Sequence, residues 1–425
     1  MAARESAGGG FSRRQLLLGG AAAAGAGAAT ALGAEAAWRT SAAGAASGAT
    51  ALTAEAASIT AVGDAVVPFH GEHQAGIETP PQAHALFVAL DLLPEVDASA
   101  LRRLMRILSD DAARLARGEP ALADSEPELA LVPARLTVTF GFGPGLVARA
   151  VGAAGAVGAS AAAPTWLRPL PPFTIDRLQP EWSDGDLLIQ FGADDALTLA
   201  HAARMLLKDA RSFGTVRWSQ RGFRRAAGAE ASGTTMRNLF GQLDGTVNPA
   251  PGSADFAEVV WVGDGPRWLQ GGTGMVLRRV AMDLDGWDRI DRPGREFAVG
   301  RRLDTGAPLT GEAEHDEPDF EAVSKLGFPV ISEVSHLRRS RSDDPRERIF
   351  RRGYNYDDAP VGASVSDAGL LFASYQADVD RQFVPIQRRL DEADLLNQWT
   401  TPIGSAVFAI PPGCDAGGYV GETLV

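Results

Sequence analysis

Hydrophobic and polar positions follow strand-like and helix-like periods in turn from about residue 85 onward. Residues 85–92 (ALFVALDL) form a continuous apolar run that is typical of a buried strand. The segment that follows, 97–118, instead places its leucines on a single helical stripe. In order, the first half predicts a strand at 85–92, a helix at 97–118, strands at 135–143 and 186–193, a helix at 196–207 and a strand at 215–219. The order β-α-β-β-α-β is that of the split βαβ, ferredoxin-like arrangement.

A long Ala-, Gly- and Pro-rich connection at 151–173 separates the strands at 135–143 and 186–193 of the first half, and the second half repeats the element order less clearly. Its predicted elements are a strand at 275–282, a helix at 292–302, strands at 348–356 and 369–376, a helix at 379–391 and a strand at 406–413. Strands and helices do not alternate as regularly as in a parallel doubly wound sheet. The pattern therefore predicts an α+β fold of tandem duplicated ferredoxin-like modules, with antiparallel sheets and helices packed on them.

Length, charge and cysteine content exclude several classes of protein for this chain. A chain of 425 residues with 45% hydrophobic residues is long and apolar enough for two packed units or one duplicated unit. Its net charge of -13 argues against nucleic acid as a partner, because such partners require clustered positive potential. The single cysteine, Cys414, excludes an intramolecular disulfide, a Cys-rich metal site and covalent c-type haem attachment.

The N-terminus resembles a twin-arginine export signal. Arg13 and Arg14 precede three leucines and a long Ala/Gly stretch, which ends in small residues that suit a signal peptidase. A transmembrane anchor is the competing interpretation, but Ala and Gly contribute little to membrane insertion. We expect a cleaved signal at 1–36, a linker at 37–60, and modules at 61–235 and 236–425. Twin-arginine export carries folded proteins, so an exported, extracytoplasmic cofactor enzyme is favoured, with the twin-arginine translocase as a transient partner.

His336 has the most distinctive setting among the six histidines. It begins a segment that holds seven arginines between residues 338 and 352, which could receive an anionic ligand. The competing interpretation is a solvated basic strand edge. His70 and His73 have a spacing that could serve a metal, but a hydrogen-bonded loop pair is favoured because no third ligand is clustered with them.

The segment 238–249 (NLFGQLDGTVNP) contains a G-x-x-D-G spacing around Asp244. Local chemistry predicts a tight turn in which the Asp side chain hydrogen-bonds its own backbone. The occurrence of this spacing about ninety residues before His336 makes a functional role more specific than an ordinary Asp-Gly turn would.

These segments resemble the dye-decolorising peroxidases, in particular the exported branch that includes the deferrochelatase/peroxidases of bacterial iron uptake. The resemblance covers nearly the whole mature chain. The segments that carry it, in the family's order, are VPFHGEHQAGI at 67–77, FGQLDGTVNP at 240–249, SHLRR at 335–339, RRGYNY at 351–356, LLFASYQAD at 370–378 and VFAIPPG at 407–413. It implies a tandem pair of ferredoxin-like modules with one haem b per chain, bound in the second module.

Residue by residue, the resemblance implies that His336 is the proximal ligand of the haem iron, and that Asp244 and Arg351 lie on the distal face. Further residues implied at the cofactor are Gly245 beside Asp244, Arg338 as partner of a haem propionate, and Leu371 and Phe372 as the apolar distal wall. A carboxylate should accept the other ring N–H of His336. Asp394 is our choice for it over Asp391 and Glu392.

The function implied is a haem b peroxidase that reduces hydrogen peroxide to water and oxidises organic electron donors such as dyes and phenols. Asp244 would move the proton, and Arg351 would stabilise developing negative charge. One alternative is deferrochelatase-type iron release from haem. Another is a haem carrier without turnover, which Asp244 and Arg351 disfavour because a carrier needs neither. The resemblance also admits iron-uptake components and further copies of the chain as partners.

Overall fold

The computed structural model describes residues 63–153, 162–360, 362 and 366–425. The predicted signal at 1–36 and the linker at 37–60 lie outside these residues. Within the described ranges, no helix has both the length and the apolar character needed to cross a membrane. The strands and helices below all belong to the compact unit that begins at Val62.

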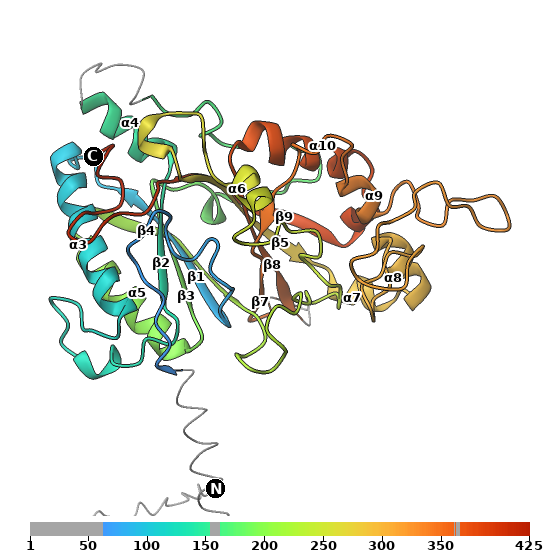
Figure 1. The fold of residues 1–425 in the computed structure, drawn as a ribbon, viewed down its shortest axis with the longest axis horizontal. Helices are drawn as coiled ribbons and strands as arrows, with labels where there is room; N and C mark the ends of the chain where they lie inside the picture. Colours follow the sequence, from blue (N-terminus) through green and yellow to red (C-terminus); the bar gives the residue numbers. More distant parts are fainter. Residues whose placement is uncertain (1–62, 154–161, 361, 363–365) are drawn as a thin grey trace, which may run out of the picture. The chain divides into compact units, whose positions relative to one another are not determined.

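Nine antiparallel strands make up one sheet in the described part of the chain (Figure 1). Their bounds are β1 (His84–Leu92), β2 (Thr137–Phe142), β3 (Leu187–Ala193), β4 (Gly214–Phe223), β5 (Thr273–Met282), β6 (Phe350–Arg351), β7 (Tyr354–Asp358), β8 (Asp367–Gln376) and β9 (Thr400–Ile410). The main helices are α3 (Ala98–Ala116), α4 (Pro144–Ala153), α5 (Ala196–Ala210), α6 (Ala254–Val260), α7 (Leu284–Asp288), α8 (Arg292–Val299), α9 (His336–Ser340) and α10 (Val384–Ala393). The predicted α+β class and antiparallel pairing are confirmed.

The sheet closes on itself, which the sequence analysis did not predict. The first half contributes the strand order β4-β1-β3-β2 and the second half β7-β8-β5-β9. The two halves meet through single residue pairs, Phe142 with Ala409 between β2 and β9, and Phe223 with Asn355 between β4 and β7. Because β5 also pairs with β8, the four-stranded halves form a ring rather than two separate sheets.

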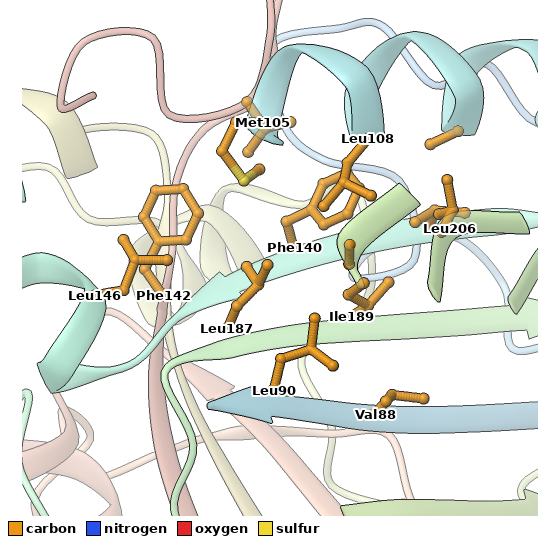
Figure 2. Close-up of a cluster of buried hydrophobic side chains, with 14 of the residues drawn as sticks. Val88, Leu90, Met105, Leu108, Phe140, Phe142, Leu146, Leu187, Ile189 and Leu206 are labelled. Atoms are coloured by element: carbon orange, nitrogen blue, oxygen red, sulfur yellow. The ribbon is translucent and has the colours of Figure 1, made fainter. Parts of the chain in front are cut away.

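The continuous apolar run of β1 is explained by burial on both faces of this closed sheet. Ala85, Phe87 and Ala89 pack in the core enclosed by the strands. The alternate residues Leu86, Val88 and Leu90 pack on the outer face, beneath α3 and α5. Figure 2 shows this outer core, in which Met105, Leu108 and Leu206 of the two helices cover side chains of β1, β2 and β3.

Helix α3 begins where its sequence provides a cap. Asp97 accepts a hydrogen bond from the backbone N–H of Ala100 at 2.8 Å, which satisfies a donor that the first turn leaves free. The predicted stripe is the buried one, with Leu101, Leu104 and Leu108 all fully enclosed. Helices α3 and α5 therefore cover the outer face of the first half, on the left in Figure 1.

In the second half, several predicted elements differ from those observed, and α8 ends at Val299 rather than at residue 302. The expected strand at 348–356 is divided into β6 and β7, because the chain leaves the ladder at Arg352 and Gly353. The expected helix at 379–391 begins with a wider turn over Val379–Phe383 before α10. The last strand spans Thr400–Ile410 rather than 406–413. Helices α8, α9 and α10 lie over this half, on the right in Figure 1.

Candidate active site

A cavity lies against the outer face of the second half of the sheet, with α9 and α10 contributing to its wall. Its empty space, including the mouth, is about 1260 Å³. Most lining residues are apolar, among them Val280, Met282, Leu370, Phe372, Phe383 and Leu390. The ionisable side chains that line it are Asp244, Arg278, Arg301, His336, Arg351 and Asp394. The cavity therefore combines an apolar body with a small set of charged groups, as ligand sites commonly do.

His336 is the first residue of α9, and its imidazole is fixed by Asp394 at the end of α10. Nδ1 of His336 donates to Oδ2 of Asp394 at 2.6 Å, and Asp394 is almost fully buried. Although His336 lies within the fold, 35% of its side chain is accessible, and the residue lines the cavity. Because Nδ1 carries the hydrogen towards the carboxylate, Nε2 keeps the lone pair that a metal requires.

The electrostatics of His336 reflect two opposing effects. Burial lowers the pKa of the imidazole, but the charge and hydrogen bond of Asp394 outweigh it, so the pKa is raised overall. Arg351 lowers and Asp244 raises the same pKa, by smaller amounts. The charges of both residues expected on the distal side therefore act on the imidazole.

The three acidic residues considered as partners of His336 have different roles in the structure. Asp391 accepts hydrogen bonds from the backbone N–H groups of Thr174 and Ile175, in the long connection between α4 and β3 of the first half. Glu392 pairs with Arg339 on the surface. Only Asp394 of these three reaches the imidazole, because it caps the end of α10 and its backbone turns towards α9.

Asp244 and Arg351 form a second charged pair in the cavity, with Nη1 of Arg351 donating to Oδ1 of Asp244 at 3.1 Å. Asp244 belongs to the loop 237–248, and Arg351 belongs to β6. Asn248 joins these two elements. Its Oδ1 accepts from the backbone N–H of Arg351 at 3.0 Å, and its Nδ2 donates to the backbone carbonyl of Arg351 at 2.7 Å.

The loop that carries Asp244 depends on glycine. Gly241 and Gly245 have φ angles of 81° and 126°, which residues with a side chain rarely adopt. Gly245 lines the open groove next to the cavity, and both Asp244 and Arg351 line the groove as well as the cavity. We therefore find Gly245 beside the site, where it shapes the turn that presents Asp244.

Two residues expected at the cofactor lie elsewhere, and the period of each element gives the reason. Leu371 points from β8 into the enclosed core, so the expectation that it lines the cavity is wrong, and Leu370 takes that place beside Phe372. Arg338 follows His336 by two residues on α9, which turns it to the other side of the helix. Its Nη1 donates to the carbonyl of Phe320 at 2.8 Å, and it does not line the cavity.

The sequence analysis missed Arg301 and the role of Asn248. Arg301 is buried and lines the cavity directly after α8. Its only sequence signal is the pair Arg301-Arg302 after Gly300, and nothing in that pair distinguishes the buried arginine from the exposed one. Asn248 was interpreted only as part of a turn, since its partner Arg351 lies more than a hundred residues away.

The other histidines of interest have structural contacts. His73 stacks on Trp261 with ring centroids 3.7 Å apart. Its Nδ1 lies within hydrogen-bond distance, 2.7 Å, of the backbone carbonyl of Gly271. His201 is enclosed with Asp124, with 2.8 Å between Nε2 and Oδ2. Among the described residues, no group of three or more His, Cys, Asp or Glu side chains is placed to hold a bare metal ion.

Comparison with known proteins identifies the family. The sequence profile of the Dyp-type peroxidase N-terminal domain matches residues 74–224, and that of the C-terminal domain matches residues 235–415. The chain therefore belongs to the Dyp-type peroxidase family, which makes it a haem-dependent peroxidase.

Relatives and solved structures agree over most of the chain. It is 39% identical to a dye-decolorizing peroxidase of Thermobifida fusca, covering 83% of both chains. It is 34% identical to the deferrochelatase of Escherichia coli K12, covering 84% of this chain and 87% of the relative. A crystal structure of a DyP-type peroxidase from Cellulomonas bogoriensis is 57% identical, with a TM-score of 0.81, and covers 85% of this chain and 99% of that chain. The structure of ferric DtpA from Streptomyces lividans is 41% identical, with a TM-score of 0.80, and covers 86% of this chain and 98% of that chain.

Proposed function

We propose that the protein reduces hydrogen peroxide to water and oxidises organic electron donors such as dyes and phenols, with one haem b in the cavity. The observation that carries this proposal is the His336–Asp394 pair, whose imidazole faces an apolar cavity that also holds the Asp244–Arg351 pair. A largely apolar cavity suits a macrocycle, and a carboxylate-supported imidazole suits its iron.

His336 would hold the iron through Nε2, and the sheet residues Leu370 and Phe372 would contact the macrocycle. When bound, haem supplies the electron transfer that links peroxide reduction to oxidation of the donors. The contribution of Asp394 is to fix the orientation and tautomer of His336, and to increase the electron density on its ring. These assignments use only groups that already line the cavity.

Asp244 and Arg351 would handle the proton and the charge. The carboxylate of Asp244 can take a proton from hydrogen peroxide and return it to the departing oxygen. The guanidinium of Arg351 is a fixed positive charge that stabilises negative charge developing on peroxide. The hydrogen bond between them and the two bonds from Asn248 keep both groups in position before peroxide arrives.

The test is the absorption spectrum of the purified full chain, with and without peroxide, for the protein itself and for His336→Ala. We expect a Soret band that responds to peroxide, and its loss or a clear change of ligation in the variant. His315→Ala is the matched control, because His315 is exposed on an acidic loop. An unchanged spectrum in His336→Ala would remove His336 as the ligand.

Iron release from haem is the second candidate, favoured by the 34% identity to a protein named deferrochelatase. The two activities differ in their products. Release of iron that spares the tetrapyrrole would leave metal-free porphyrin, which fluoresces, whereas peroxidase turnover would leave haem bound and the donor oxidised. Incubation of the holoenzyme with and without peroxide, followed by porphyrin fluorescence, separates them.

We also propose that the protein is exported by the twin-arginine route, so that it works outside the cytoplasm. The support is the Arg13-Arg14 pair and the Ala/Gly stretch after it. Export should fail in Arg13→Lys/Arg14→Lys, because the receptor reads the paired guanidinium groups. Secretion of that double variant at the normal level would point to another route.

The two halves are further proposed to be tandem ferredoxin-like modules. The support is that the strand order β4-β1-β3-β2 of the first half matches the order β9-β5-β8-β7 of the second half, strand for strand. Apart from the added α4 in the first half, and the three helices α7–α9 and the divided strand β6–β7 in the second, both halves follow the order β-α-β-β-α-β. Superposition of the two halves on each other tests this assignment, since matched strands and helices should overlay without reordering.

A further inference from the structure

Arg301 is a buried cation at the cavity with no acidic partner. It follows Gly300, which ends α8 in a left-handed conformation with φ of 85°. The residue is only 9% exposed and lines the cavity. Its Nη1 donates to the backbone carbonyls of Gly306 at 2.7 Å and Glu314 at 2.8 Å. In the part of the chain that the structure describes, no carboxylate forms an ion pair with it.

Every other charged group that lines the cavity is paired. Arg351 pairs with Asp244, His336 with Asp394, and Arg278 with Asp176. Among the described residues that line the cavity, Arg301 is therefore the positive charge without an ion-pair partner, and Glu314 and Glu317 act on it only from beyond ion-pair distance. A buried charge without a counter-charge is costly, so such a group indicates that an anion belongs beside it. Burial, and then the positive charge of Arg351, lower the pKa of Arg301, in agreement with a missing anion.

The guanidinium group of Arg301 is held in place by hydrogen bonds. Both carbonyls that Nη1 contacts belong to the segment 306–314. Glu314 holds that segment against the chain that carries Asp244, because its Oε1 accepts from the hydroxyls of Thr235 at 2.6 Å and Thr246 at 3.0 Å. A guanidinium fixed in this way loses little freedom on binding a carboxylate.

We propose that Arg301 binds a carboxylate of the group in the cavity, and we assign that carboxylate to a propionate of haem. The assignment rests on the haem site of the proposed function. Arg338, which the family resemblance suggested for this role, is occupied by the carbonyl of Phe320 and packs over its ring at 5.3 Å. A carboxylate on an organic donor has the same chemistry, and the experiment separates the two sources.

The experiment measures how fast haem leaves the holoenzyme for an excess of apomyoglobin. The protein, Arg301→Leu and the control Arg302→Leu are each loaded with haem or with haem dimethyl ester, in which both propionates are blocked. Arg302 is a matched control because it is the adjacent arginine and is exposed. We expect Arg301→Leu to release haem about tenfold to a hundredfold faster, as for loss of a charged hydrogen bond, and Arg302→Leu to match the parent.

The ester gives the decisive comparison. With the ester, the parent and Arg301→Leu should release the cofactor at similar rates, because no carboxylate is left to bind. Equal acceleration for haem and ester would show a structural role and overturn the proposal. A second result would also overturn the proposal: Arg301→Leu releases haem at the parent rate, but its KM is raised for a donor that bears a carboxylate and not for the neutral amide of that donor. The anion beside Arg301 would then belong to the donor.

Two further arms keep the outcome interpretable. Arg301→Lys retains the charge without the planar fork, so it should release haem at an intermediate rate and still distinguish haem from ester. If Arg301→Leu does not fold, the comparison of haem and ester release in Arg301→Lys tests the proposal instead. Failure of the parent protein to bind haem at all would instead overturn the proposed function, which separates the two conclusions.

Discussion

In the proposed function, Asp244 and Arg351 would divide the chemistry of the distal side between a proton carrier and a fixed charge. Both side chains are partly accessible from the cavity and the adjoining groove, so a small molecule such as peroxide can reach them. Each role depends on the atoms of one side chain. Substitutions that remove the carboxylate of Asp244 or the charge of Arg351 therefore test each role separately.

Asp244→Asn and Arg351→Leu should both retain haem and react more slowly with hydrogen peroxide. Loss of a general base or of a stabilising charge typically costs about a hundredfold or more. We expect the loss in Arg351→Leu to be at least as large as that in Asp244→Asn. Stopped-flow absorbance after mixing with peroxide measures it, with Arg346→Leu as control because Arg346 is exposed and paired on the surface. Parent-like rates in Arg351→Leu would contradict these roles while leaving the fold intact.

At the scale of elements, the distal site exists because a loop and a short strand are held together. The side chain of Asn248 hydrogen-bonds both backbone groups of Arg351, so it holds the loop with Asp244 in a fixed position against β6. Asn248→Ala should lower the free energy of unfolding by about 1–3 kcal/mol, through two lost, partly buried hydrogen bonds. It should also slow the reaction with peroxide, although Asn248 carries no charge.

Urea unfolding and stopped-flow kinetics check these two effects of Asn248→Ala. Gln74→Ala is a suitable control, since the side chain of Gln74 likewise bonds both backbone groups of one residue, Phe140, at 2.8 and 3.0 Å, and does not line the cavity. A variant that loses stability but reacts at the parent rate would show that Asn248 supports the fold without positioning Arg351.

A second element-scale feature lies between α3 and α5, where Asp111 and Asp209 face each other. Burial, and then the neighbouring Asp111, raise the pKa of Asp209 to about 7. The folded protein therefore keeps a proton there between about pH 4 and pH 7, whereas the unfolded chain has released it. Stability must fall as pH rises through this window and level off above it.

Asp209→Asn should remove this pH dependence. The variant should be more stable than the parent near pH 7 and 8, and the advantage should shrink towards pH 4, where the Asp209 carboxyl group gains its proton in the unfolded chain as well. Thermal or urea unfolding across pH 4 to 8 measures it. Asp110→Asn, an exposed substitution on α3, should leave the parent profile unchanged. A parent-like slope in Asp209→Asn would show that the proton resides elsewhere.

For the whole molecule, net charge governs which donors approach. The chain carries -13, and removal of residues 1–36 would leave -14, because three arginines and two glutamates would be lost. A negative surface repels anionic dyes at neutral pH, and protonation of surface carboxylates in acid weakens that repulsion. An aspartate also remains a competent base well below neutral pH, because the reference pKa of its side chain is about 4.

We therefore expect peroxide turnover to be faster in acid than at neutral pH, with a steeper rise for an anionic donor than for a neutral one. Rate against pH for the two donors measures this. Added salt should narrow the difference between them, because the Debye length falls to about 10 Å at 0.1 M. A profile that peaks above neutral pH for both donors would contradict the expectation.

The sequence by itself determined the order of elements, the class of fold and the residues at the centre of the site. Its hydrophobic periods located the strands and helices, since burial depends on local alternation. Its motifs led to His336, Asp244 and Arg351, and the choice of Asp394 agrees with the contact to His336 that the structure displays. Each of these inferences uses residues close together in the chain or a resemblance carried by such segments.

Only the tertiary structure decided which side chains share a space. Closure of the sheet depends on two single residue pairs between distant strands, which no local pattern encodes. The face of a strand decided between Leu370 and Leu371, and the turn of a short helix directed Arg338 away from the cavity. The structure also shows that Arg301 lines the cavity without an ion-pair partner among the described residues, which its position in the sequence does not indicate. These features arise from long-range packing, in which the partner of each residue is set by the whole fold.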